Sequence, residues 1–324
     1  MKSCKNRFRN NKGAALITVI LIISILVAAA LELNRASRAD VYYAANIGDG
    51  IKLTYVAKSG FYGAAALLIN SKGDYDTLRD SWAKAEILSA QSKGYFPTGN
   101  FIVKVEDEKG KIPLNKLVDG NVVNPDIRDL LLRLLSLPEF DLNKNKAGEI
   151  VDAIIDWIDE NGDITGSGAE GAFYSTQAFP HTAKNAPLDC IKELLMIRGI
   201  SSEIYAGTKE KPGLAQYVTI YGTGAININT APKMVLRALS DTISAELADK
   251  MDEYRKADGN DLSSPLWYKK ISGLENVLIK PELIENVKSN YFKIDSTGVS
   301  DNMEQTISGV IRRSPFQILS WRQD

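Results

Sequence analysis

The sequence is poor in cysteine and histidine. Its 324 residues include two cysteines and one histidine. Cys4 precedes a long apolar run and Cys190 lies far behind it, so no intrachain disulfide is possible if the N-terminal segment is removed or stays in the cytosol. Cys190 lies in an apolar helical pattern, which predicts a buried thiol. We therefore expect the body of the protein to be held together by its core or by a metal ion.

The same scarcity argues against an enzyme. His181 is the only histidine, which excludes a zinc site built from several imidazoles. A Ser-His-Asp arrangement is conceivable, but no nucleophile elbow lies near a candidate serine. We expect a protein without enzymatic activity.

Acidic residues are absent before Glu32, whereas basic residues precede the apolar run at Lys2, Lys5, Arg7, Arg9 and Lys12. Residues 14–31 carry no charge, and as a helix they would be about 27 Å long, close to the roughly 30 Å of a hydrocarbon core. Because the basic residues lie on one side only, the positive-inside rule places residues 1–13 in the cytoplasm and the body outside it. The body itself is mildly acidic, which argues against non-specific binding to nucleic acid.

Proline is absent before Pro97, and the helical pattern continues behind the apolar run. Small and apolar residues recur there at steps of three and four, up to Ile69. Three interpretations of the N-terminus compete: a secretory signal cleaved near residues 28–30, a plain membrane anchor, and the class III signal of type IV pilins. The long continuation favours the pilin signal, because a secretory signal needs no helix behind it.

The body changes pattern several times along the chain. A helical pattern begins at Asp74, and residues 101–112 alternate as a β-hairpin would. Helical segments follow at 126–135, 149–158, 188–197, 232–239 and 246–255. Residues 217–229 predict a strand among them, and further strands are expected from residue 291 onward. The pattern leaves open how the strand at 217–229 joins a sheet.

The acidic stretch 156–174, DWIDENGDITGSGAEGAFY, is the best candidate site. Its oxygen ligands would select Ca²⁺ or Mg²⁺ over zinc. With Asp159 as position 1, the EF-hand positions 3, 5, 7, 9 and 12 are filled by Asn161, Asp163, the Thr165 carbonyl, Ser167 and Glu170. Ile164 stands where an EF-hand has glycine, so only the ligand order matches. The alternative is a solvated acidic loop that follows a helix end.

Two further motifs match functional patterns. Residues 166–171 fit G-x-G-x-x-G, but an acidic loop precedes them and would repel phosphate, so we interpret the match as chance. Residues 192–207 and 229–259 resemble helix-hairpin-helix elements. We interpret both as packing units, because the second carries several acids, and the alternative is a DNA-binding hairpin.

Three motifs together resemble the protein K family of type II secretion systems. They are KGAALITV at 12–19, DWIDENGD at 156–163 with GAEGAFY at 168–174, and INTAP at 228–232. The resemblance covers essentially the whole chain. It implies an α+β fold in which a long N-terminal helix packs on an antiparallel pilin-like sheet, with a large all-helical insertion similar to a sterile-alpha-motif domain.

The resemblance also implies a division of the chain. Residues 1–13 would be a class III leader peptide and residues 14–33 the transmembrane part of the helix. Residues 34–115 and 290–324 would form the pilin-like domain around a helical insertion at 116–289. A prepilin peptidase would cut between Gly13 and Ala14 and methylate Ala14. The protein would cross the bacterial inner membrane once, with its C-terminal body in the periplasm.

The absence of an acidic residue near the start of the apolar run has a functional interpretation. Most pilins carry glutamate at the fifth mature residue, where this chain has Thr18. A buried glutamate would pair with the terminal ammonium of a neighbouring subunit, because an unpaired charge in a bilayer is costly. A subunit without it suits the end of a filament, and the resemblance likewise implies the tip of a pseudopilus.

The resemblance finally implies partners and a cofactor. The partners are minor pseudopilins I and J, with H as a further candidate, and no nucleic acid. The cofactor is calcium at the acidic loop, with Asp159, Asp163 and Glu170 as the principal ligands and Asp156, Asn161 and Thr165 as additional ones. The alternative of another class is a membrane-anchored helix-hairpin-helix DNA-binding protein of a competence pilus.

Overall fold

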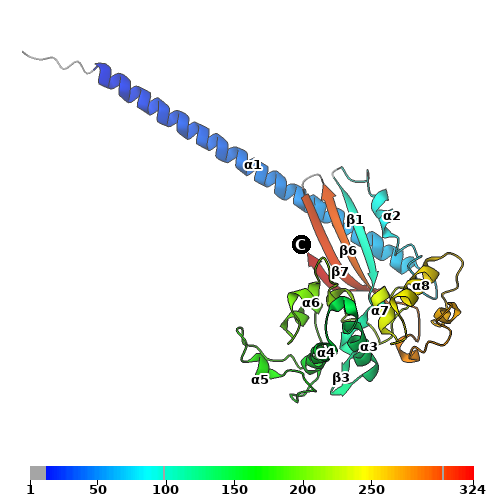
Figure 1. Ribbon diagram of the computed structural model, residues 1–324. Helices are drawn as coiled ribbons and strands as arrows, with labels where there is room; N and C mark the ends of the chain where they lie inside the picture. The colour runs from blue at the N-terminus through cyan, green and yellow to red at the C-terminus, as the bar shows by residue number, and fades with distance from the viewer. Residues whose placement is uncertain (1–11, 98, 301–302) are drawn as a thin grey trace, which may run out of the picture.

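A single N-terminal helix, α1 (Lys12–Asn70), dominates the shape of the molecule (Figure 1). The computed structural model describes residues 12–97, 99–300 and 303–324, so most of the predicted leader, residues 1–11, lies outside the described residues. The apolar first part of α1 is exposed along its whole length, with a mean hydropathy of 3.0 over its most apolar window. It is long and apolar enough to cross a membrane.

The second half of α1 packs on an antiparallel sheet. The strand order is β1 (Asn100–Asp107), β6 (Tyr291–Ser300), β7 (Met303–Arg312) and β8 (Gln317–Gln323). Leu53, Ala57 and Phe61 of α1 are buried against one face of this sheet. The contact is close because Gly60 leaves room for the Phe101 ring and the Ser296 hydroxyl. The predicted α+β fold, with a long helix on an antiparallel sheet, is confirmed.

The predicted hairpin at 101–112 is wrong. β1 pairs with β6, from Asn100 opposite Val299 to Asp107 opposite Phe292. Glu108–Gly110 form a 3-10 turn, and β2 (Ile112–Pro113) instead pairs in parallel with β5 (Val218–Thr219). Alternation identifies a strand and its buried face but not its partner, which here follows much later in the chain.

The strand expected at 217–229 is reduced to β5, which lies outside the four-stranded sheet. The residues after it run as irregular chain, and the side chains of Asn227 and Asn229 are buried and hydrogen-bonded there. A further short pair, β3 (Val118–Asp119) and β4 (Val122–Val123), is antiparallel.

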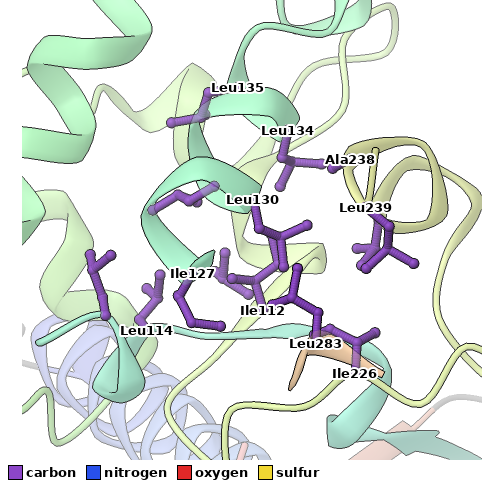
Figure 2. Close-up of a cluster of buried hydrophobic side chains, with 14 of the residues drawn as sticks. Ile112, Leu114, Ile127, Leu130, Leu134, Leu135, Ile226, Ala238, Leu239 and Leu283 are labelled. Carbon is purple, nitrogen blue, oxygen red and sulfur yellow. The ribbon is translucent and has the colours of Figure 1, made fainter. Parts of the chain in front are cut away.

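Short helices fill the chain between β1 and β6. They are α3 (Pro125–Leu135), α4 (Lys144–Ile158), α5 (Gly171–Tyr174), α6 (Ser202–Ala206), α7 (Lys233–Ala238) and α8 (Ala245–Lys256). Asn124 caps α3 and Ser244 caps α8, each through a side-chain oxygen that accepts a backbone N–H. Their apolar faces meet in one core, part of which, around Leu130, Ile226 and Leu283, is drawn in Figure 2.

Two helical predictions need correction. The pattern that begins at Asp74 yields only α2 (Ala85–Gln91), because turns occupy the residues before it. Residues 188–197 contain a 3-10 helix, Ile191–Met196, rather than an α-helix. Cys190 precedes that helix and is exposed, so the predicted buried thiol is also wrong.

A buried polar cluster, here called the polar seam, joins the sheet to the helical part. It consists of Asp76, Asp107, Asn227, Ser289 and Arg313, all of them buried. Asp107 accepts hydrogen bonds from the Asn227 amide at 3.1 Å and from the Ser289 hydroxyl. Arg313 donates two hydrogen bonds of 2.8 Å to the two carboxylate oxygens of Asp76. The seam therefore ties segments that are far apart in the sequence.

Candidate functional site

Helix α4 carries the first acids of the candidate site into the interior. Asn143 caps it by accepting a hydrogen bond from Lys146 N at 2.8 Å. Ile150, Ile154 and Trp157 bury its apolar face. The helix ends at Ile158, and the chain turns away in extended conformation at the next residue. The acids near this end are therefore held at the border between a packed helix and a loop.

Three carboxylates of the loop are buried, and each is only half satisfied. Asp156 is fully buried, and Asp159 and Glu170 are nearly so. One oxygen of each accepts a hydrogen bond: from Thr165 N at 2.9 Å, from Asn161 Nδ2 at 3.2 Å and from Gly171 N at 3.2 Å, respectively. The other oxygens, Asp156 Oδ2, Asp159 Oδ1 and Glu170 Oε1, have no partner among the described residues.

Such oxygens are costly to leave unpaired. A buried polar atom without a hydrogen bond loses its solvation and gains nothing in return, and the loss is larger for a charged group. The three atoms come from residues 156–170, a short stretch, rather than from scattered positions. The arrangement is therefore poised to accept positive charge, from a proton or from a hard cation.

The pKa values of these carboxyls point the same way. Burial, and after it the charges of Asp156 and Asp163, raise the pKa of Asp159 to about 6, although the hydrogen bond from Asn161 acts against this. Burial also raises the pKa of Asp156, although hydrogen bonds from Thr165 act against this. Glu170 has a raised pKa for the same first reason, with neighbouring acids as a second. Each group thus binds a proton more tightly than an isolated carboxyl does.

Other residues hold the loop against α4. Asp152 accepts a hydrogen bond from Ser167 N at 3.1 Å, and Arg198 donates one of 2.9 Å to the Gly168 carbonyl. Asn121 accepts hydrogen bonds from Glu160 N at 3.0 Å and from Asn161 Nδ2 at 3.1 Å. Neither Asn121 nor Arg198 was predicted to contact the loop, because no pattern in the sequence links either residue to it.

The sequence-predicted ligands do not all converge. Asp163 is exposed, and its backbone N–H donates to Asn161 Oδ1 at 2.6 Å. The Thr165 carbonyl accepts a hydrogen bond from Gly168 N at 2.8 Å, so it already takes part in a turn. Across residues 12–97, 99–300 and 303–324, no three His, Cys, Asp or Glu side chains are already arranged around a metal position.

The donor chemistry nevertheless fits a hard cation. The three unpaired atoms are carboxylate oxygens, which calcium and magnesium prefer. Asp156, Asp159 and Glu170 would hold such an ion, which would supply the positive charge that these buried oxygens lack. Histidine and cysteine take no part in this cluster, which disfavours zinc.

The predicted processing site lies in the first turns of α1. Gly13 and Ala14 are exposed on the helix, and a side chain at Gly13 would meet no atom within 4 Å. Thr18 is also exposed, and its hydroxyl donates to the Ala14 carbonyl at 3.0 Å. The Thr18 hydroxyl is therefore satisfied within its own helix.

Family models described as type II secretion system protein K match residues 110–222 and 226–277. The acidic loop lies inside the first match. Together the two matches span about half of the chain, and they cover most of the helical part rather than α1 or the last strands.

Individual proteins extend the likeness. The type II secretion system protein K of Aeromonas hydrophila is 25% identical over 320 residues, which are 90% of this chain and 89% of that protein. A protein of Escherichia coli strain K12 that also carries a protein K name is 25% identical and aligns with 67% of this chain and 65% of its own length.

A solved structure has the same fold. It is the crystal structure of the GspK-GspI-GspJ complex from the type 2 secretion system of enterotoxigenic Escherichia coli. One of its chains matches with a TM-score of 0.66 and 21% identity, over 89% of this chain and 99% of that one.

Proposed function

Because this chain belongs to the type II secretion system protein K family of minor pseudopilins, we propose that it is a non-enzymatic subunit at the tip of the pseudopilus. There it would take part in pseudopilus assembly for the export of folded proteins across the outer membrane. The observation that carries this proposal is a long apolar helix, exposed over its first half, on a body that matches the family.

The exposed half of α1 supports a membrane location. An apolar surface of this length is unstable in water and needs lipid or the apolar helices of neighbouring subunits around it. The basic residues before it favour an inner-membrane orientation with the body in the periplasm. In this proposal a prepilin peptidase cuts after Gly13 and methylates Ala14, so that α1 is kept in the mature protein.

Thr18 supports the tip position. A glutamate at this point would need a cationic partner from a subunit above it, whereas the Thr18 hydroxyl is satisfied by the Ala14 carbonyl. A subunit that needs no cationic partner from a neighbour above it is suited to the end of the filament. The bulk of the body also favours an end position, because the helical part extends well beyond the sheet (Figure 1).

The unpaired carboxylate oxygens support a cation at the acidic loop, and we propose calcium. Asp156, Asp159 and Glu170 are the principal ligands in this proposal, because their free oxygens are buried. Asp163, Asn161 and the Thr165 carbonyl join only if the loop closes around the ion. In Figure 1 the segment near α5 lies in the helical part, far from the apolar end of α1, so the ion would stabilise the body and not the membrane segment.

The partners proposed are the minor pseudopilins I and J of the same system, with H as a further candidate. The matching solved chain comes from a complex with GspI and GspJ. We propose no contact with nucleic acid. The second helix-hairpin-helix resemblance lies on α7 and α8, where Lys233 is paired with Asp249 and Lys250 with Glu246, which leaves little free positive charge for phosphate.

The test combines two measurements on cells that make the full system. Mass analysis of the membrane-extracted protein should find a chain that starts at methylated Ala14. Gold-labelled antibody against the body should mark one end of isolated pseudopili. A start beyond Ala30 would contradict retention of α1, and label spaced along the shaft would contradict the tip position.

A further inference from the structure

The two edges of the pilin-like sheet differ in whether another strand can join them. The β1 edge is covered by helix α2, whose serines make hydrogen bonds that a neighbouring strand would otherwise make. Ser89 Oγ accepts from Val103 N at 2.8 Å, and Ser92 Oγ accepts from Phe101 N at 3.2 Å. A covered edge of this kind does not pair with another chain.

The β8 edge is open. Thr306 and Asp324 exchange both of their backbone hydrogen bonds, of 3.1 and 2.9 Å. Because hydrogen-bonded pairs alternate along antiparallel strands, the N–H and C=O groups of Trp321 and Gln323 point away from β7. Those outward groups have no hydrogen-bond partner among the described residues. The Trp321 ring packs on Phe61 of α1, with 4.9 Å between ring centroids, so the open strand is held in place.

A groove lies beside this edge, on the face of the sheet that is turned away from α1. Its volume is about 900 Å³, within the roughly 300–1,000 Å³ of ligand-binding pockets. Val310 and Arg322 line the sheet side of the groove, whereas Ile311, the neighbour of Val310, belongs to the core under α1. Tyr205 of α6 and Tyr221 line the opposite wall, and Figure 1 shows α6 beside the C-terminal strand. A strand added to β8 would therefore turn one of its two faces toward this groove.

One positive charge in the groove is not compensated. Lys192 lines the groove and is exposed. The acids nearest to it in the sequence, Asp189 and Glu193, are both paired with Lys184, at 2.7 and 2.9 Å. Lys192 itself has no carboxylate within ion-pair distance in the described part of the chain. A ligand that fits the groove should therefore bring an acid to this position.

This charge decides among the possible occupants. The strand that a second copy would offer, β8 itself, has the sequence QILSWRQ, with one cation and no acid. The residues that precede α1 in the sequence are also basic and include no acid. Neither segment would neutralise Lys192, which favours a segment of a different protein.

We propose that the β8 edge and this groove, together called the β8 groove, bind an extended segment of a partner protein that adds to the sheet as a further strand. The outward backbone groups of Trp321 and Gln323 hold the segment by main-chain hydrogen bonds. Its alternate side chains enter the groove, apolar ones against Tyr205 and Tyr221 and an acidic one at Lys192. This inference goes beyond the proposed function and does not depend on it, because the groove lies on the body, away from the membrane segment and from the acidic loop.

The backbone contact is tested with a displayed library of random ten-residue peptides, selected on the full-length protein in detergent. We expect the enriched peptides to alternate β-forming with polar residues and to contain aspartate or glutamate. Gln323→Pro removes an outward N–H, a change that edge strands tolerate. Gln323→Ala loses the same side chain but keeps the N–H, so it is the matched control. We expect an enriched peptide to bind Gln323→Pro about tenfold more weakly than Gln323→Ala.

The charge contact is tested by reversing Lys192. Selection on Lys192→Glu should enrich peptides with lysine or arginine in place of the acid. Lys269→Glu is the control, because Lys269 is likewise exposed but does not line the groove. Its enriched peptides should keep the acid. The same preference for an acid in both variants would overturn the inference.

Cys190 supplies a measurement that needs no variant. Its thiol is exposed and the residue lines the groove. A bound peptide should slow the alkylation of Cys190 by iodoacetamide severalfold, measured by peptide mapping, which distinguishes Cys190 from Cys4.

Four further outcomes would overturn the inference. They are a library that enriches no peptide, equal binding to the two variants at position 323, alkylation of Cys190 that bound peptide leaves unchanged, and a dimer of this chain that Gln323→Pro dissociates. The last would identify a second copy as the occupant of the edge. All of these outcomes leave the proposed function intact, because that proposal is tested by the N-terminus of the mature chain and by its place on the pseudopilus.

Discussion

Two clusters of buried carboxylates in this molecule differ in how they are satisfied. In the polar seam, Arg313 meets both oxygens of Asp76, and Asp107 accepts from Asn227, Ser289, Thr230 and the Lys109 backbone. In the acidic loop, one oxygen each of Asp156, Asp159 and Glu170 has no partner among the described residues. Residues of the same kind thus form a fully hydrogen-bonded structural joint in one place and a set of partly unpaired carboxylates in the other, which is the cation site that we propose.

The difference shows which buried acids point to a ligand. Burial alone does not, because Asp107 is as buried as the loop acids and its pKa is likewise raised to about 6, chiefly by burial. The number of unpaired oxygens is the feature that separates the two clusters. In the polar seam the described chain supplies a partner to the carboxylate oxygens, whereas in the acidic loop the unpaired oxygens would be satisfied by a proton or by the proposed cation.

The largest effect should come from removing the arginine of the polar seam. Arg313→Ala removes both hydrogen bonds of 2.8 Å from the buried Asp76 carboxylate and leaves it only the partly exposed Lys288 ammonium, at 3.7 Å, as a counter-ion among the described residues. We expect this to lower the free energy of unfolding by about 3 kcal/mol, the low end for breaking a buried pair. Urea unfolding of the body measures this. Arg312→Ala is the control, because Arg312 bonds only to Gln317 and the Pro315 carbonyl near the surface. Equal losses for the two variants would show that the seam is not the joint described above.

The next largest effect on stability should come from binding of calcium at the acidic loop. Calcium at a hundredfold excess over its Kd should stabilise the protein by about 2.7 kcal/mol. Chelation should therefore lower Tm by about 5–10 °C. Asp156→Asn should abolish the response, whereas Glu160→Gln, an exposed change beside the loop, should keep it. A melting curve that EDTA leaves unmoved would remove calcium from the proposed function.

Alanine substitutions at two glycines of the loop should test how closely the backbone packs on Asp156. Gly168 packs so closely on Asp156 Oδ2 that an added Cβ would overlap it, whereas a Cβ at Gly162 would meet nothing within 4 Å. We expect Gly168→Ala to cost about 1–3 kcal/mol by overpacking and to weaken calcium binding by displacing Asp156. Gly162→Ala should do neither. Thermal melts with calcium and with EDTA distinguish the two variants, and matching behaviour would contradict the tight contact.

The smallest effect is a dependence on pH. The pKa of Asp159 rises from 3.8 to about 6 on folding, so the folded chain holds this proton more tightly than the unfolded chain. Stability should fall as the pH rises from about 4 to about 6 and remain lower above it. Without calcium, Asp159→Asn should reduce this fall. Asp107 gives a fall of the same sign that calcium cannot cancel, so melts at several pH values, with and without calcium, separate the clusters. A fall that is unchanged in Asp159→Asn would contradict the loop's share.

The sequence predicted the elements that depend on local periodicity. Helix α1 follows from its long uninterrupted pattern, and α3 and α4 follow from apolar residues at helical spacing. The prediction of a hairpin at 101–112 was wrong because the alternating pattern does not identify the strand with which β1 pairs. The prediction of a buried Cys190 thiol was wrong because the 3-10 helix after it does not continue the expected apolar face.

The candidate site was predictable only in part, for a similar reason. Asp156, Asp159 and Glu170 lie within one short stretch, so their proximity could be inferred from spacing. Asn121 and Arg198 reach the loop through folding of the helical part, which no spacing in the sequence reveals. Which oxygens remain unpaired is a property of the packed structure, and only the coordinates of these side chains could identify it.

The order of the strands sets the order in which the molecule can be completed. β1 is made early, but its neighbour β6 comes only after all the helices of the body. A chain synthesised from its N-terminus therefore carries β1 without its neighbour β6 until the helical part has been made, and in the proposed function α1 would by then be held in the bilayer. The final strands close the sheet against that helix, so in the proposed function arrival of the C-terminal segment would mark the moment at which the subunit becomes competent for assembly.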